Sequence, residues 1–140
     1  MNVSISRTDD LKACLNLRRR VFIEEQGVPE ADELDEHDAG AVHLLAHDGD
    51  MPVGTARIVL SGEVGKIGRV CVLASHRGTG LGAGLIRFAL AHLGKEPGLR
   101  IARLGAQTHA LGFYERLGFV VVGDEYQDAG IAHSDMERAV

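Results

Sequence analysis

The stretch Val70-Cys-Val-Leu-Ala-Ser-His-Arg-Gly-Thr-Gly-Leu-Gly-Ala-Gly84 reads as an apolar strand, a turn dense in glycine and the start of a helix. Glycine lacks a Cβ atom and tolerates a positive φ, so the backbone at Gly78, Gly80 and Gly82 can approach a ligand closely. Consecutive N–H groups then point at one anion, with the positive end of the following helix dipole behind them. Arg77 adds a permanent guanidinium that suits phosphate oxygens. The stretch therefore predicts a binding site for a diphosphate group.

Composition limits the classes of protein to which the chain can belong. Its 140 residues are 45% hydrophobic and 25% charged, which is typical of a globular chain, and we expect a single domain over residues 1–140. The net charge of −5 argues against a general role in binding nucleic acid. No segment has the ~20 apolar residues of a membrane helix or resembles a signal peptide, so we expect a cytoplasmic protein with no membrane partner. The two cysteines, Cys14 and Cys71, are expected to be reduced thiols in the core.

The order of the expected elements indicates a mixed α/β fold. Strands are expected at residues 3–7, 41–47, 53–60, 66–73, 100–106, 119–122 and 134–140, the last of them as an edge strand. Helices are expected at residues 11–22, 80–93 and 108–117. Glycine-containing turns at residues 48–52 and 61–65 separate three successive strands, which favours an antiparallel meander.

Two common nucleotide-binding motifs fit the glycine turn poorly. A phosphate loop of the NTPase type needs Gly-x4-Gly-Lys-Ser/Thr, and neither Lys-Ser nor Lys-Thr follows these glycines. A dinucleotide fingerprint, G-x-G-x-x-A, fits Gly78, Gly80 and Ala83, but it follows the fourth expected strand and no acid ends the next one. A nucleotide-dependent oxidoreductase stays open as an alternative that these positions disfavour.

Four segments resemble one enzyme family. Arg77-x-x-Gly80-x-Gly82 resembles the Arg/Gln-x-x-Gly-x-Gly/Ala signature of the GNAT superfamily of acyl-CoA-dependent N-acyltransferases. Phe113-Tyr-Glu-Arg-Leu-Gly-Phe119 resembles the second landmark of that family, on its last helix. Residues 21–29, and residues 128–133 followed by Met136, resemble the small ElaA/YjcF-like bacterial branch, with Ala132 where proline is usual. The resemblance implies a GNAT-like fold: a central, mostly antiparallel sheet, splayed between its fourth and fifth strands and flanked by helices.

The resemblance also implies acetyl-CoA as co-substrate and a set of residues that contact it. The pantetheine is expected to pair with the backbone of Val70, Cys71 and Val72, as an added strand would. The pyrophosphate is expected on the backbone of Arg77, Gly78, Thr79, Gly80, Leu81 and Gly82. Tyr114 matches the position from which family members offer a phenol to the sulfur, which implies a general acid that also contacts the cofactor. No metal is expected, because His43 and His47 lack further clustered ligands.

The general base is not evident from the sequence. Many family members carry a carboxylate on the strand before the glycine turn, but residues 66–73 contain no acid. Glu24 or Glu25 acting through water, and His109, one helical turn before Phe113, are the candidates.

Two indications about the acceptor disagree. The acidic stretch of Glu30, Asp32, Glu33, Asp35, Glu36 and Asp38 would attract a cationic amine. Arg18, if it faces the cleft, would suit an acceptor that carries a carboxylate, although a snorkelling side chain at the core edge is the alternative. The predicted function is transfer of acetyl from acetyl-CoA to a primary amine of a small molecule by direct attack. A non-catalytic acyl-CoA-binding or sensing module is the alternative function, and both a monomer and a homodimer fit the sequence.

Overall fold

The computed structural model describes residues 2–28 and 36–140. Within these residues the strands are β1 (Val3–Thr8), β2 (Val42–Asp48), β3 (Met51–Ser61), β4 (Val64–Val72), β5 (Ile101–Gln107), β6 (Val120–Asp128) and β7 (Ile131–Ala139). The helical segments are α1 (Leu11–Arg18), η1 (Arg19–Glu25), η2 (Glu36–Ala39), η3 (Ala74–His76), α3 (Leu81–Gly94), η4 (Thr108–Ala110) and α4 (Leu111–Glu115). The strands form a seven-stranded sheet in the order β1-β2-β3-β4-β5-β7-β6.

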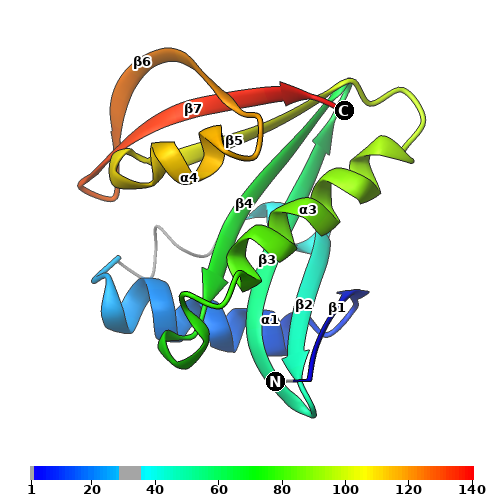
Figure 1. Ribbon diagram of the computed structural model, residues 1–140, viewed down its shortest axis with the longest axis vertical. Helices are drawn as coiled ribbons and strands as arrows, with labels where there is room; N and C mark the ends of the chain where they lie inside the picture. The colour runs from blue at the N-terminus through cyan, green and yellow to red at the C-terminus, as the bar shows by residue number, and fades with distance from the viewer. Residues whose placement is uncertain (1, 29–35) are drawn as a thin grey trace.

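The sheet opens between β4 and β5, which are its one parallel pair of neighbouring strands within the described residues. Residues 64–67 of β4 pair with residues 101–104 of β5, and beyond them the two strands continue without pairing. Figure 1 shows them meeting at one end and running apart toward the other. The predicted α/β fold, with a mostly antiparallel sheet splayed between its fourth and fifth strands, is therefore confirmed.

A bulge in β4 lies where the two strands separate. Thr55 of β3 pairs with Cys71, and Arg57 pairs with Gly68, so β4 has one more residue than β3 between these pairs. Arg69, inside this interval, has a φ of 51°, which is unusual for a residue with a side chain. Bulges change the direction of the side chains that follow and increase the local twist.

Helices cover both faces of the sheet, with α1 and η1 on one face and α3 on the other (Figure 1). The core between them contains Leu44, Ile58 and Ile67 from the sheet and Leu85 from α3, all fully buried. Gly65 of β4 is required for this packing, because a Cβ there would overlap the side chain of Leu93 in α3. Cys14 and Cys71 form no disulfide and are buried in this core, as expected.

Two expectations about local structure were wrong. The last strand, β7, is not an edge strand, because it lies between β5 and β6 and pairs with both. The helix expected over residues 11–22 is α-helical only to Arg18 and continues as the π-helical segment η1, in which Gln26 N–H donates to the carbonyl of Val21 at 3.1 Å. Within the described residues, no helix combines the length and apolar character needed to cross a membrane.

Candidate active site

The glycine turn before α3 presents unused backbone donors. Gly78 and Gly80 have φ values of 77° and 86°, so both need a residue without a Cβ, whereas Gly82 lies inside α3. Among the described residues, no hydrogen bond is formed by the N–H groups of residues 78–82. Two of these residues, Leu81 and Gly82, lie in the first turn of α3, where N–H groups have no intrahelical acceptor. The nearest atom to a Cβ at Gly82 would be in the ring of Phe113, at 3.7 Å. The turn therefore has the free amides that an anion site requires.

The edge of β4 beside the turn also has backbone polar groups that do not pair with a neighbouring strand. Leu73 N–H donates to the carbonyl of Val53 on β3 at 2.9 Å. Successive N–H groups of a strand point in opposite directions, so the N–H and C=O of Val72 face away from β3, into the opening. Val70 and Val72 are half-buried, whereas the side chain of Cys71 packs in the core. An extended chain can pair with this edge as an added strand.

Arg77 lies over this same edge. Its Nε donates to the carbonyl of Val72 at 3.0 Å, and its Nη2 lies 2.8 Å from a carboxylate oxygen of Glu25. Both side chains of this ion pair are partly exposed, so the pair is weak and a stronger anion can replace Glu25.

A cavity of about 290 Å³ occupies the opening between β4 and β5, and Tyr114 of α4 lines it. The Tyr114 ring makes edge-to-face contacts with Phe113 and Phe119, at centroid distances of 5.0 Å and 6.1 Å. Burial raises the pKa of the Tyr114 phenol above its ordinary value. The phenol is therefore protonated at neutral pH and able to donate a proton into the cavity.

The strands β6 and β7 add a second group of polar side chains to the cavity. Tyr126 and His133 both line it, and their rings stack at a centroid distance of 5.9 Å. The Tyr126 hydroxyl donates to Asp135 at 2.7 Å, above Gly105 of β5, where a Cβ would come within 2.6 Å of that hydroxyl oxygen. The missing side chain at Gly105 thus makes room for Tyr126 at the cavity wall.

The family of the chain follows from its similarity to known proteins. The family model for the acetyltransferase (GNAT) domain matches residues 9–140. The chain belongs to the GNAT family. The N-acetyltransferase YjcF of Bacillus subtilis is 38% identical over 140 residues, which cover 99% of each chain. The crystal structure of Escherichia coli ElaA has a TM-score of 0.87 and 32% identity, covering 97% of this chain and 99% of that one. An acyl-CoA N-acyltransferase from Pseudomonas aeruginosa has a TM-score of 0.86 and 31% identity, covering 98% of both chains.

As a GNAT enzyme, the protein is an acyl-CoA-dependent N-acyltransferase of the ElaA/YjcF-like branch. The GNAT fold uses acetyl-CoA or related thioesters, and the acceptors of the family are amines of small molecules or of proteins. The free amides of the glycine turn and the unpaired edge of β4 are the parts of this chain that fit the co-substrate.

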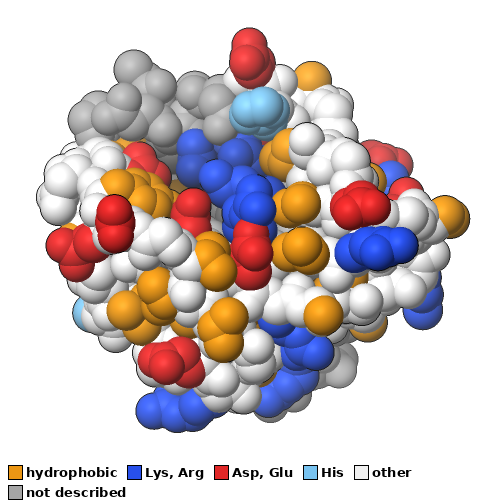
Figure 2. Space-filling model, turned by 90° about the horizontal axis from the view of Figure 1, so that it is seen from above, with side chains coloured by type: hydrophobic (Ala, Val, Ile, Leu, Met, Phe, Trp, Pro, Cys, Tyr) orange, Lys and Arg blue, Asp and Glu red, His pale blue; other side chains and the backbone are white. Residues whose placement is uncertain are grey.

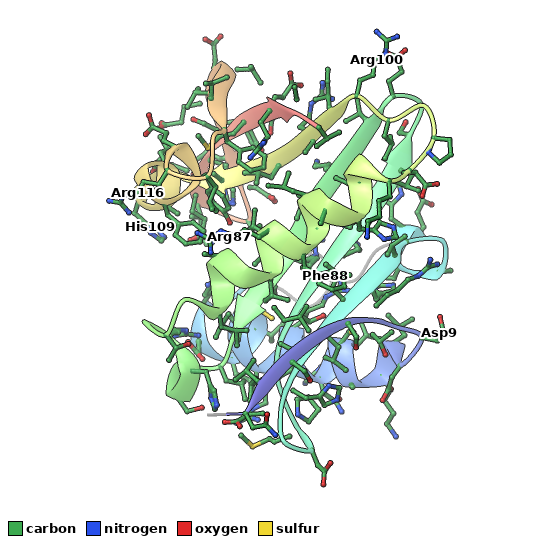
Figure 3. The ribbon with its side chains drawn as sticks, turned by 45° about the vertical axis from the view of Figure 1, so that its right-hand side comes forward. Asp9, Arg87, Phe88, Arg100, His109 and Arg116 are labelled. Atoms are coloured by element: carbon green, nitrogen blue, oxygen red, sulfur yellow. The ribbon has the colours of Figure 1, made fainter. Side chains whose placement is uncertain are left out.

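His109, a candidate base of this GNAT enzyme, does not line the cavity. It is exposed, and Figure 3 shows it on the same side of the molecule as Arg116. Its Nε2 donates to Gln107 Oε1 at 2.6 Å, and Gln107 in turn donates to Gln26 at 3.2 Å. The two glutamines line the cavity, so His109 reaches the site only through them.

The other candidate side chains also lie away from the cavity. Arg18 is only 1% exposed, and it donates to both carboxylate oxygens of Asp38, at 2.6 Å and 3.1 Å. Glu24 and Glu25 line a separate pocket with residues 73–75. Glu36 is exposed and Asp38 is buried, while residues 30–35 of the acidic stretch lie outside the described part of the chain. The position of Arg18 thus fits the alternative of a side chain held at the core.

Sequence reasoning missed several side chains of the site: His133, Tyr126, Arg57, Lys66 and Arg69. His133 was part of the segment that resembles the ElaA/YjcF-like branch, so a signal was present, but its neighbours are on other strands. No local pattern marks Arg57 or Lys66, because only the topology of the sheet brings β3, β4 and β7 to one cavity.

Proposed function

We propose that this enzyme transfers an acetyl group from acetyl-CoA to a primary amine of a small molecule, by direct attack of the amine on the thioester. The observation that carries the proposal is the opening between β4 and β5, which combines an unpaired strand edge with the Tyr114 phenol in one cavity. The cavity of about 290 Å³ has the size of a small-molecule site. We further propose that residues 1–140 act as one cytoplasmic acyltransferase domain.

Backbone groups of this chain would hold the co-substrate. The free N–H groups of residues 78–82 fit its pyrophosphate, with Arg77 at the rim. The edge of β4 at residues 70–72 fits the amide groups of the pantetheine arm. Acetyl-CoA supplies the reactive thioester, and the protein positions it beside Tyr114.

The transfer makes one bond and breaks one. The acceptor nitrogen forms a bond to the carbonyl carbon, and the carbon–sulfur bond breaks. The acceptor ammonium must lose a proton before attack, since the pKa of an alkylammonium is near 10 in water. Negative charge collects on the carbonyl oxygen, where the Val72 N–H facing the opening is a suitable donor, worth about 3 kcal/mol in comparable sites.

Tyr114 would donate the proton that the departing sulfur needs. Its hydroxyl is neutral at physiological pH because burial raises the pKa of the phenol. It lies on the cavity lining, in α4, which packs against β5 and β6. The products are the N-acetylated amine and the free thiol of CoA. The nitrogen loses its second proton as the amide forms, and water carries this proton back to Tyr114.

His133 would accept the proton of the ammonium. Its Nδ1 lies 2.7 Å from the carbonyl oxygen of Ile131, which can only accept, so Nδ1 carries the hydrogen. In the neutral ring, Nε2 then has a free lone pair for proton transfer. His133 lines the cavity and His109 does not, which favours His133 as the base.

The test is release of free thiol from acetyl-CoA in the presence of small primary amines, with Tyr114→Phe as the diagnostic variant. We expect Tyr114→Phe to lower kcat about 100-fold and to leave the Kd for acetyl-CoA within about twofold. Tyr126→Phe is the matched control, and its effect on kcat should be much smaller because that hydroxyl is bonded to Asp135. Binding of acetyl-CoA with no turnover on any amine would instead support the sensing module.

A further inference from the structure

We infer that the acceptor carries an anionic group at a distance from its reactive amine, and that Lys66 and Arg69 bind this group. The inference rests on the proposed function, because it names the substrate class of the same site. The sequence left two indications in conflict, a cationic amine and an acceptor that carries a carboxylate, and this inference favours an acceptor with an anionic group.

Three basic side chains form one wall of the cavity. Arg57 of β3 and Lys66 and Arg69 of β4 line the cavity that contains Tyr114. The same three line an adjoining cavity of about 410 Å³, together with His37 and Arg103. Figure 2 shows Lys and Arg side chains gathered in the middle of this face of the molecule. Among the described lining residues, Asp128 is the carboxylate of the first cavity, and the second has none.

The bulge in β4 brings two of these cations to the same cavity. Residues three apart in a regular strand point to opposite faces of the sheet. Lys66 and Arg69 nevertheless line the same two cavities, because Arg69 itself lies in the bulge, directly after the last regularly paired residue, Gly68. Arg69 has the φ of 51° in this bulge, a conformation that costs about 1 kcal/mol and is often found at functional sites.

The cations of the wall differ in what they already contact. Arg103 pairs with Glu137 of β7, and Arg57 donates to Asp38 at 3.2 Å. Lys66 is exposed, and within residues 2–28 and 36–140 its ammonium has no hydrogen-bond or ion-pair partner. Lys66 is therefore the cation that a ligand can bind without breaking an existing contact.

The layout of the cavity determines where the anion lies relative to the amine. Tyr114 and Val70 mark the end at which the thioester is expected, and Lys66 and Val59 mark the end shared with the adjoining cavity. An acceptor with its amine at the first end and its anionic group at the second end is therefore an extended molecule. Carboxylates and phosphates both suit an ammonium beside a guanidinium, so they share this chemistry.

The experiment compares acceptors that differ only in the group remote from the amine. The probes are straight-chain ω-amino carboxylates of two to five methylenes, their neutral amides, the corresponding diamines, and aminoalkyl phosphates of the same lengths. Thiol release from acetyl-CoA gives kcat/KM for each probe. We expect one of the two anionic series to exceed the neutral amides by about tenfold or more, as a charge-assisted contact would give. The better of the two identifies the anion.

Lys66→Gln tests the assigned residue, with Lys95→Gln as control, because Lys95 is also exposed but lies after α3, outside both cavities. The advantage of the anionic acceptor should fall at least fivefold in Lys66→Gln, through KM, and stay constant in Lys95→Gln. Calorimetric titration of the enzyme–CoA complex with the anionic amine gives a readout independent of turnover, and its Kd should rise in the same variant.

The outcomes separate this inference from the proposed function. Turnover with neutral amines or diamines as good as with anionic ones, or an equal preference in Lys66→Gln, overturns the inference and leaves the acetyltransferase proposal intact. Binding of anionic amines that depends on Lys66, with no thiol release from any probe, supports the inference and contradicts the proposed reaction.

Discussion

The guanidinium of Arg77 lies 2.8 Å from the carboxylate of Glu25 and also donates to the carbonyl of Val72 at 3.0 Å. Arg77 thus contacts both Glu25 and the edge of β4 that we propose holds the pantetheine arm. A bound pyrophosphate has to compete with Glu25 for the guanidinium, and a pantetheine amide has to compete with Arg77 for Val72.

Removing the charge of Glu25 should therefore strengthen the binding of acetyl-CoA. An exposed ion pair is worth up to about 1 kcal/mol, so we expect Glu25→Gln to lower the Kd by up to about fivefold at low salt. Arg77→Gln should raise the Kd about tenfold, because a charge-assisted contact is lost. Titration calorimetry at two salt concentrations measures both changes. Glu63→Gln, in the exposed pair with Arg100 and outside the site, is the control, and weaker binding by Glu25→Gln would show that Glu25 orients Arg77 instead.

The left-handed conformation of Gly80 should matter for both stability and binding. Its φ of 86° leads us to expect a loss of about 1 kcal/mol in the free energy of unfolding for Gly80→Ala. The shift of its N–H should also weaken acetyl-CoA binding by about tenfold, the value of one lost hydrogen bond to a charged group. Gly94→Ala, at the last residue of α3, is the control, since the free energy of unfolding should rise by up to about 0.5–1 kcal/mol. Equal effects of the two substitutions on the Kd would exclude a special role for the turn.

The assignment of His133 as base predicts a difference between two histidines. His133→Ala should lower kcat about 100-fold, whereas His109→Ala should change it only a few fold, because His109 is outside the cavity. Both should bind acetyl-CoA with unchanged Kd. Added imidazole should restore part of the activity of His133→Ala and none of the loss in His109→Ala. Activity of His133→Ala within threefold of the parent would rule out the assignment.

The buried triad of Arg18, Asp38 and Arg57 should make stability depend on acid pH. Burial by itself would raise the pKa of Asp38, but hydrogen bonds and charge from Arg18, and then from Arg57, outweigh it and lower the pKa to about 2. The ordinary pKa of the carboxyl is 3.8, so its contribution to stability is fully present above that value and is lost as the pH falls toward 2. The lost free energy is about 2 kcal/mol.

Urea unfolding of Asp38→Asn measures this contribution. At pH 7 we expect the free energy of unfolding to fall by about 3 kcal/mol, because the substitution leaves buried guanidinium groups without their carboxylate. The difference from the parent should shrink by about 2 kcal/mol between pH 5 and pH 2. Asp50→Asn, in an exposed turn, should differ by less than about 0.5 kcal/mol. A difference that does not vary with pH would contradict the ion-pair explanation.

The sequence was sufficient to predict the order of helices and strands along the chain and the position of the glycine turn. A strand, a run of alternating glycines and an amphipathic helix are local patterns, and local backbone preferences determine them. The position of Arg77 and of Tyr114 followed from segments that resemble a family. The π-helical segment at Arg19–Glu25 was missed, because an α-helix and a π-helix share their apolar spacing over one or two turns.

Tertiary structure alone decided the partners of each charged side chain. Nothing in the sequence distinguishes Arg18, which is buried against Asp38, from Lys66, which faces a cavity, because their partners are on other strands and helices. The place of β7 between β5 and β6 likewise brings His133 next to Tyr126 and into the cavity. The glycine turn that we propose binds the pyrophosphate is thus formed by consecutive residues. The cavity that we propose as the acceptor site depends on the sheet order and on one bulge, which bring together side chains distant in sequence.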